Sequence, residues 1–236
     1  MAAHLAKHQK MTKRQMKEDP LVTAAFRATE VWEQHGRTIL IVAGAVVLVG
    51  LLVFFVLRTR SQAEEKARGD LFRAMITLQQ GDYATAGPML KELIDNAPGT
   101  GSARDALLML GDASMGQKNP AEAATWYQKY IDKVGGDRVM ARAGYLGLGT
   151  AYEDAGEFVK AADAYAKAAE LGTSDNQRGR AMLSEARSLT RAGQVDKAID
   201  LYRKIVALPT AEIPVHDAAN MHLGELQMER SNPAAN

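Results

Sequence analysis

The sequence contains no cysteine. This excludes disulfide bonds, thiolate metal sites, c-type haem attachment and cysteine nucleophiles together. The zinc-protease pattern HExxH, the hydrolase pattern GxSxG, a P-loop and an EF-hand loop are also absent. Among the five histidines, His4 and His8 have a metal-compatible spacing but no third ligand nearby. His216 and His222 are six residues apart on a predicted helix, on roughly opposite faces, which does not favour a shared ligand role. We therefore expect a non-catalytic protein with no metal and no cofactor.

The chain as a whole also lacks a large excess of positive or negative charge, since its formal net charge is only +1. The balance is uneven along the chain. Residues 1–60 hold nine Lys and Arg against four Asp and Glu, whereas residues 61–236 hold twenty against twenty-four. A mildly acidic domain does not favour the phosphate backbone of nucleic acids. We therefore expect no nucleic-acid partner.

One stretch, residues 39–57 (ILIVAGAVVLVGLLVFFVL), has no charged and no strongly polar side chain. As a helix these nineteen residues would be about 28 Å long, close to the ~30 Å hydrocarbon core of a bilayer. A helix also satisfies each backbone polar group within lipid. A cleavable signal peptide has a shorter leader and a shorter apolar core. The stretch therefore predicts an uncleaved transmembrane helix over residues 38–58.

Two segments precede this span. Residues 1–18 form a basic arm, and its Lys13, Arg14 and Lys17 are candidate contacts for acidic lipid headgroups. The electrostatic attraction to such a membrane surface is about 1 kcal/mol for each basic residue. Alternatively, these charges belong to a disordered tail and only set topology. Residues 19–37 predict a juxtamembrane amphipathic helix that starts with Asp19 as N-cap and places Trp32 near the headgroups. Its apolar face could instead pack on a neighbouring membrane subunit.

The basic residues around the span predict its orientation. Seven Lys and Arg precede it, and five lie in the stretch just after it. By the positive-inside rule this favours a cytoplasmic N-terminus. We therefore expect a single-pass protein of a bacterial inner membrane, with residues 59–236 exported to the periplasm.

Residues 59–236 carry an internal repeat. They are rich in Ala, Leu, Glu, Lys and Gln and show no alternating β-branched run, which predicts helices. A small residue recurs at spacings of 37, 38, 37 and 38, at Ala74, Gly111, Gly149, Ala186 and Gly224. The pattern predicts an all-α fold, in which the transmembrane helix is followed by an α-solenoid of about four and a half helix-pair repeats. The last helix, about residues 215–230, would cap the solenoid.

Three more positions recur in each unit. An alanine on the second helix faces the small residue, at Ala86, Ala123, Ala161 and Ala198. A large residue four positions later would wedge between helix pairs, at Leu90, Tyr127, Tyr165 and Tyr202. Gly81, Gly156 and Gly193 would end the first helix in a left-handed turn. Lys118 stands where a fourth glycine would, and Asn119-Pro120 is expected to supply the turn instead.

The unit from Leu148 to Leu171, LGTAYEDAGEFVKAADAYAKAAEL, resembles a tetratricopeptide repeat (TPR). The order of basic arm, single span and repeat domain resembles the YfgM-like family of bacterial membrane-anchored repeat proteins. So does the stretch KEDPLVTAAFRATEVWEQHGRTIL before the span. That resemblance implies an inner-membrane accessory protein whose periplasmic repeats assist the protein translocon and periplasmic chaperones.

The first helices of the units would line the concave side of the solenoid. We expect a partner-binding groove there, made by Leu71, Met75, Asp105, Leu108, Asp112, Leu146, Thr150, Glu153, Arg180, Leu183, Arg187 and Arg191. The arginines among them could clamp a carboxylate or an acidic segment of a partner. Alternatively, they form a solvated face and pair with local acids such as Glu185.

Two functions fit these features. The first is a scaffold or accessory factor that binds other proteins, either membrane-complex subunits or exported clients, while its anchor contacts membrane lipid. The second is a constitutive structural subunit of a large inner-membrane complex, respiratory or photosynthetic. Such a subunit would contact the complex through its span, arm and periplasmic domain.

Overall fold

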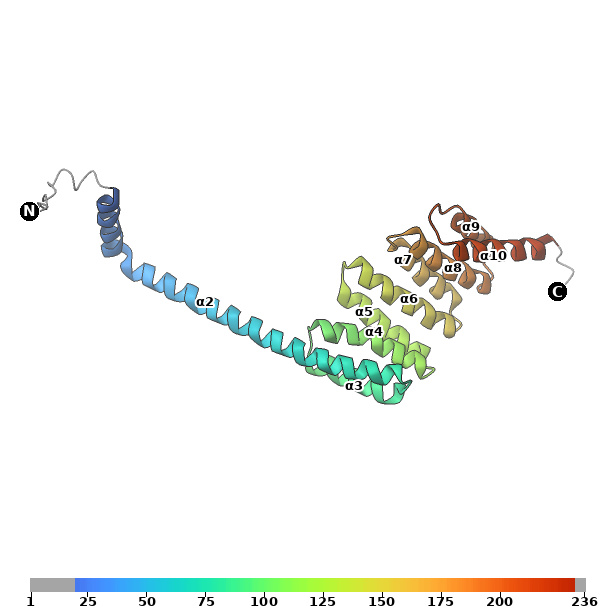
Figure 1. Ribbon diagram of the computed structural model, residues 1–236, viewed down its shortest axis with the longest axis horizontal. Helices are drawn as coiled ribbons and strands as arrows, with labels where there is room; N and C mark the ends of the chain where they lie inside the picture. Colours follow the sequence, from blue (N-terminus) through green and yellow to red (C-terminus); the bar gives the residue numbers. More distant parts are fainter. Residues whose placement is uncertain (1–19, 232–236) are drawn as a thin grey trace, which may run out of the picture. The chain divides into compact units, whose positions relative to one another are not determined.

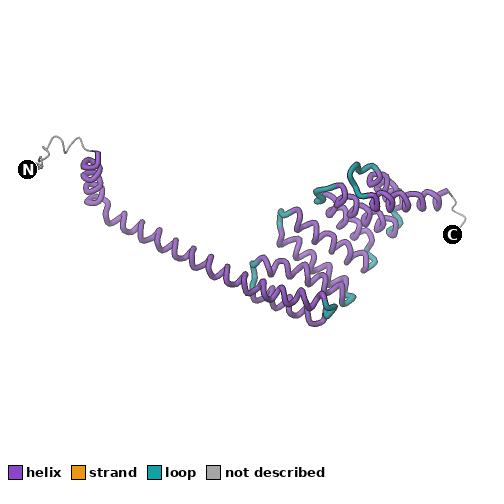
Figure 2. Tube along the Cα trace, viewed as in Figure 1, coloured by secondary structure: helices purple, strands orange, loops and turns teal. Residues whose placement is uncertain are grey.

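The computed structural model describes residues 20–231, and every regular element in that range is a helix (Figure 2). The helices described are α2 (Pro20–Gln79), α3 (Tyr83–Asn96), α4 (Gly101–Gly116), α5 (Pro120–Val134), α6 (Arg138–Asp154), α7 (Phe158–Glu170), α8 (Asp175–Arg191), α9 (Val195–Val206) and α10 (Ile213–Ser231). The predicted all-α fold is confirmed.

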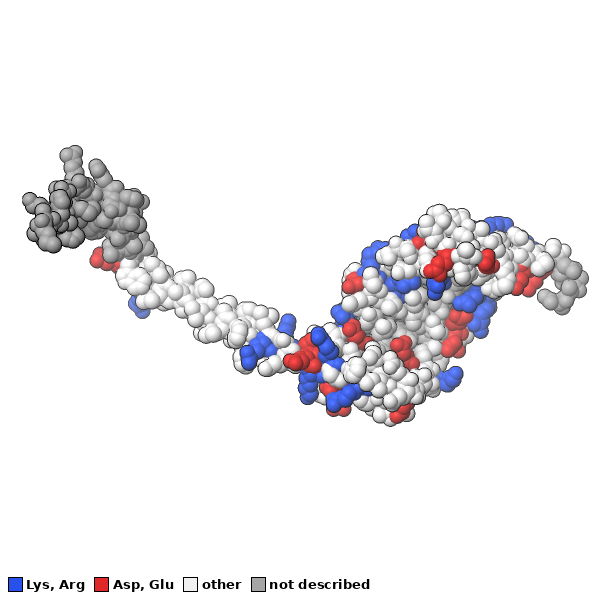
Figure 3. All heavy atoms as spheres, viewed as in Figure 1, with Lys and Arg blue, Asp and Glu red and all other residues white. Residues whose placement is uncertain are grey.

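The chain divides into two compact units, residues 1–59 and residues 60–236. In the first unit the described residues all belong to α2. The most apolar window of this helix has a mean hydropathy of 3.2, and none of it is buried. In Figure 3 the surface of this stretch is uncharged, with charged side chains before and after it. By length and composition, α2 can therefore cross a membrane.

Helix α2 continues without a break across the ranges predicted as juxtamembrane helix, span and start of the repeat domain. The connecting sequence, RTRSQAEEKARGD after Leu57, contains no proline and consists mostly of good helix formers. No helix end therefore marks the predicted boundaries at residues 37 and 58. The division into four segments stays a prediction.

The second unit is a stack of helix pairs (Figure 1). The part of α2 from Arg60 onward packs with α3 and α4 in one apolar core. The following pairs are α4 with α5, α6 with α7, and α8 with α9, and from α3 to α10 each helix contacts the next along the chain. Helix α10 packs on α9 and α8 and has no following helix among the described residues. Four pairs and one further helix agree with the predicted four and a half repeats.

The close crossing inside each pair depends on the small residue of the repeat. A Cβ atom added at Gly111 would lie 2.5 Å from the ring of Tyr127, and one added at Gly149 would lie 2.7 Å from the ring of Tyr165. The four alanines on the facing helices are all fully buried, and these are Ala86, Ala123, Ala161 and Ala198. The wedge positions are buried as well, at Leu90, Tyr127, Tyr165 and Tyr202. The predicted packing positions are confirmed.

The turns inside the pairs follow the prediction at three of four places. Gly81, Gly156 and Gly193 have φ angles between 76° and 78°. Lys118 also adopts the left-handed region, with φ 62°, so the expectation that Asn119-Pro120 supplies this turn instead is wrong. Asn119 caps α5, where its side chain accepts a bond from the backbone N–H of Glu122 at 3.4 Å. The repeat geometry therefore holds lysine in the backbone conformation that glycine adopts elsewhere. This conformation costs a residue with a side chain about 1 kcal/mol of stability.

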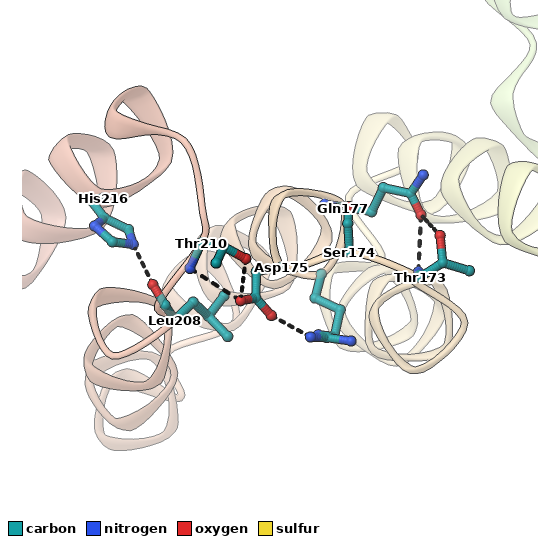
Figure 4. A network of polar contacts seen from close by, with 8 residues as sticks. Thr173, Ser174, Asp175, Gln177, Leu208, Thr210 and His216 are labelled. Atoms are coloured by element: carbon teal, nitrogen blue, oxygen red, sulfur yellow. Dashed lines mark hydrogen bonds and ion pairs between the residues drawn. The ribbon is translucent and has the colours of Figure 1, made fainter.

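Polar side chains near the ends of the helices connect consecutive helix pairs. Figure 4 shows this between the first residue of α8 and the α9–α10 loop. Asp175 Oδ2 accepts bonds from the backbone N–H of Thr210 at 3.2 Å and from its hydroxyl at 2.7 Å. The Thr210 hydroxyl and the Arg178 guanidinium hold the pKa of Asp175 below its usual range. His216 Nε2 lies 2.9 Å from the carbonyl oxygen of Leu208. The start of α10 is therefore held in place from two sides.

A carboxylate plays a similar part at the first junction. Glu64 on α2 accepts bonds from the backbone N–H groups of Gly101 at 2.7 Å and Ser102 at 3.1 Å, and from the Ser102 hydroxyl at 2.7 Å. The negative charge thus lies at the N-terminus of α4, where the helix dipole favours it. These bonds, led by the Ser102 hydroxyl, lower the pKa of Glu64.

Candidate functional site

The predicted groove residues lie on α2, α4, α6 and α8, the first helices of the four pairs. Because they follow the spacing of the repeat, equivalent residues form two rows across these helices. The leucine row is Leu71, Leu108, Leu146 and Leu183. The second row, called here the central row, is Met75, Asp112, Thr150 and Arg187. The same face therefore presents one apolar row and one mixed row.

The leucine row is only partly exposed. Its members pack against the four apolar cores, Leu71 with the first pair and Leu183 with the last. Leu108 and Leu146 pack on the cores between them. These side chains stabilise the stack, and only their outer edges are open to a ligand.

The central row is more open, and tyrosine hydroxyls from the second helices reach it. Asp112, Thr150 and Arg187 are exposed. The Tyr127 hydroxyl donates to Asp112 Oδ1 at 2.6 Å. The Tyr165 hydroxyl lies 3.1 Å from Thr150 Oγ1. The wedge residues therefore fix polar groups on this face as well as filling the core.

Sequence reasoning assigned the tyrosines to packing alone and missed these bonds. The signal available was the choice of Tyr over Phe, because a buried phenol usually finds a hydrogen-bond partner. Burial raises the pKa of Tyr127, and it raises the pKa of Tyr165 to about 12. Both phenols therefore remain protonated at neutral pH, and each donates to a carboxylate, Tyr127 to Asp112 and Tyr165 to Glu153.

The predicted arginines do not form one open cluster. Arg191 Nη1 pairs with Glu153 Oε1 at 3.0 Å and lies over the ring of Phe158. Arg180 Nη2 pairs with Glu212 Oε2 at 2.9 Å. Both arginines thus pair with acids from neighbouring helix pairs. This agrees with the alternative prediction that the arginines pair with local acids, although Glu185 is not one of their partners.

Arg187 differs from these two arginines. It donates to Ser184 Oγ at 3.2 Å, and among the side chains of residues 32–231 it has no carboxylate within ion-pair distance. Its position in the central row makes it the available cation of this face. Of the predicted arginine clamp, Arg187 alone is therefore open to an acidic group of a partner.

The remaining predicted residues are placed as follows. Asp105 pairs with its neighbour Arg104 at 3.0 Å. Trp32 lies on α2 and is exposed. Lys13, Arg14 and Lys17 lie outside the described residues. No group of three His, Asp or Glu that could hold a metal ion occurs in the range searched, which is the described part of the chain.

Glu185, predicted as a partner of the arginines, lies instead in a groove of about 400 Å³ between α7 and α9. Asp163 of α7 and Lys204 of α9 also line this groove. Burial raises the pKa of Glu185 to about 7, and Asp163 and Glu170 add to the shift while Lys204 opposes it. Because the ordinary value is near 4.5, folding favours the protonated acid. This stabilisation is complete below pH 4.5 and is lost as the pH rises through about 7.

Replacing Glu185 with glutamine is therefore expected to raise the melting temperature at pH 8 and leave it nearly unchanged at pH 4, below the ordinary pKa of the carboxyl. Allowing for the solvent on the open side of the groove, the gain is about 1 kcal/mol, or about 2 to 4 °C. Thermal unfolding at the two pH values, followed by circular dichroism, measures it. Asp200→Asn, at an exposed residue lining the same groove, is the control and should show no such pH dependence. An equal gain at both pH values would contradict the assignment.

Comparisons with known proteins agree with this architecture. The tetratricopeptide repeat family model matches residues 73–138 and 183–236, just over half of the chain. A search of curated proteins finds no match. Among solved structures, a candidate kinesin light chain from Podosopora anserina with nearly identical TPR-like repeats is similar, with a TM-score of 0.59 and 17% identity. The alignment covers 72% of this chain and 89% of that one.

Two further solved structures are similar. A point variant of the same Podosopora anserina protein has a TM-score of 0.59 and 18% identity, over 72% of this chain and 88% of that one. MamA has a TM-score of 0.49 and 21% identity, over 69% of this chain and 97% of that one. At these identities the similarity to the Podosopora anserina structures concerns the fold alone.

Proposed function

Because this chain belongs to the tetratricopeptide repeat family, we propose that it is a single-pass membrane protein whose repeat domain binds other proteins and catalyses no reaction. Stacked helix pairs present a long continuous surface, and such folds serve as interaction modules. Helix α2 supplies a stretch with the length and hydropathy of a membrane span. Together these features describe a protein-binding domain tethered beside a membrane.

The central row carries this proposal. It places an exposed Asp112, Thr150 and Arg187 on successive first helices, at one position per repeat. The tyrosine hydroxyls behind the row hold its polar groups in fixed positions, which reduces the entropy lost on binding. An extended segment of a partner lies on this row, with an acidic residue opposite Arg187.

The membrane location is argued from the sequence. The basic excess before the span favours a cytoplasmic N-terminus, and the repeat domain is then periplasmic in the inner membrane of a bacterium. The basic arm lies at the surface of acidic lipid. The YfgM-like resemblance supports partners at the translocon or among periplasmic chaperones, either as membrane-complex subunits or as exported clients. Tethering raises the effective concentration of the domain near such partners.

Site-specific crosslinking tests the proposal. A photoreactive residue is placed at Thr150, and a matched one replaces the exposed Lys167 on the second helix of the same pair. After irradiation of cells and gentle detergent extraction, discrete protein adducts are expected from position 150 and not from position 167. Arg187→Glu is expected to weaken the position-150 adduct at least about tenfold, because it sets like charges against each other. Mass spectrometry then identifies the partner.

Adducts of equal strength from both positions would contradict a binding face on the first helices. Adducts only from a third photoreactive residue in the span, at Val47, would favour the second function. In that case the chain is a constitutive structural subunit of a respiratory or photosynthetic complex, held by its membrane helix.

A further inference from the structure

Gly224 on α10 is the fifth member of the small-residue series, but within the described part of the chain no side chain packs over it. At Gly111 and Gly149 an added Cβ atom would lie 2.5 Å and 2.7 Å from a tyrosine ring of the paired helix. At Gly224 an added Cβ atom would meet no atom within 4 Å. The position that elsewhere admits a wedge residue is therefore open on α10.

The neighbours of Gly224 on the same helix face are open as well. Met221 is equivalent to Leu183 by the repeat spacing, and Met228 is equivalent to Met115. Leu183 and Met115 are partly buried against apolar cores. Met221 is 55% exposed and Met228 is 66% exposed. Met221, Gly224 and Met228 therefore form an uncovered apolar strip, called here the end strip.

The opposite side of α10 is firmly packed. Val215, Ala219 and Leu226 are buried in the last apolar core. Arg230 Nη1 pairs with Asp196 at 2.9 Å, and the bonds at Thr210 and His216 hold the loop before the helix. The end strip is thus presented by an ordered helix.

We propose that the end strip binds an amphipathic helix of a partner protein that carries an alanine followed four residues later by tyrosine or leucine. The surface continues the interfaces already formed four times within the chain. In each of them the second helix places a fully buried alanine and a buried Leu or Tyr against the first helix, in the pairs Ala86 and Leu90, Ala123 and Tyr127, Ala161 and Tyr165, and Ala198 and Tyr202.

The charge beside the strip adds to the description of this partner. The acidic residues Asp217, Glu225 and Glu229 are exposed on α10. A helix with lysines flanking its apolar face therefore complements the charge beside the strip. Helix α7 is an example of such a helix, because it carries the exposed Lys160 and Lys167. The end strip lies outside the central row, so the two surfaces are tested separately.

The probe is a peptide with the sequence of residues 157–171, EFVKAADAYAKAAEL. A lactam between Asp163 and a lysine introduced by Val159→Lys, at two exposed positions four residues apart, keeps it helical and leaves the charges of Lys160 and Lys167 in place. Fluorescence anisotropy with the full chain in mild detergent is expected to give a Kd below about 1 mM. The same peptide with Tyr165→Ala should bind at least about tenfold more weakly, because its wedge residue is lost.

The matching change in the protein is Gly224→Leu, which fills the position meant for the wedge. We expect it to weaken peptide binding at least about tenfold, while Arg187→Glu leaves binding unchanged. Absence of binding by the stapled peptide, or equal binding to the Gly224→Leu protein, would overturn the proposal. So would self-association of the full chain that Gly224→Leu abolishes, because a second copy would then be the occupant of the strip.

Discussion

Replacing Gly149 with leucine is expected to lower the free energy of unfolding of the repeat domain by about 2 to 3 kcal/mol. A Cβ atom at this position would already lie 2.7 Å from the ring of Tyr165, and leucine adds three more carbons. Tyr165 is 4% exposed and packs against Gly149, so its ring cannot swing out into solvent without opening the core. The helices must therefore separate, and their shared core loses contacts.

The control for this substitution lies in the same chain. Gly224→Leu changes the same repeat position on α10, where an added Cβ atom would meet no described atom within 4 Å. Leucine is also the better helix former, so stability should stay equal or rise by up to about 1 kcal/mol. Urea unfolding of both variants in detergent, followed by circular dichroism, gives the comparison. Equal losses at the two positions would show that the packing of Gly149 on Tyr165 does not stabilise the stack.

This contrast shows why the solenoid could be predicted from the sequence. Close crossing of two helices demands a small residue at one place and a large residue opposite it, and the demand recurs with each pair. The spacing from Ala74 to Gly224 therefore contains most of the information on helix pairing. The same rule located the wedge residues, because each lies four positions after a buried alanine.

The polar contacts of the candidate site could not be predicted in the same way. Glu153 and Arg191 are 38 residues apart and meet only because consecutive first helices lie next to each other. Which acid meets which arginine depends on side-chain reach and on the tilt of each pair, which the repeat pattern does not specify. Glu185 has the same charge as Glu153, but it lies on the other side of its helix, in the groove between α7 and α9.

Local residue preferences also failed to predict the backbone conformation of a turn whose ends are fixed by the packing of the helices. Lys118 carries a side chain that disfavours the left-handed region, yet it adopts φ 62°. The positions of α4 and α5 are set by their contacts with α3 and α6, and the turn between them must follow. A single unfavourable residue at about 1 kcal/mol is small beside the burial of a whole helix pair.

The largest effect is expected from changes to the apolar part of α2. Val47→Arg combined with Leu51→Arg should move the protein from the membrane pellet to the soluble fraction after carbonate extraction. Both side chains are exposed, at 62% and 63%, in a stretch whose window is not buried anywhere. An arginine near the centre of a spanning helix costs about 2.5 to 3.5 kcal/mol, so two of them oppose insertion by about 5 kcal/mol or more.

Val139→Arg provides the matched control, because Val139 is 71% exposed at the start of α6 in the repeat unit. If lipid surrounds the apolar part of α2, an arginine at Val139 does not affect insertion, and the Val139→Arg protein should stay in the membrane pellet. The repeat unit has its own apolar cores, so its unfolding transition should be the same in all three proteins. A double variant that stays in the pellet would mean that the repeat unit or a partner holds the chain at the membrane. Loss of wild-type protein from the pellet would exclude a spanning helix, and the binding face would then act in solution.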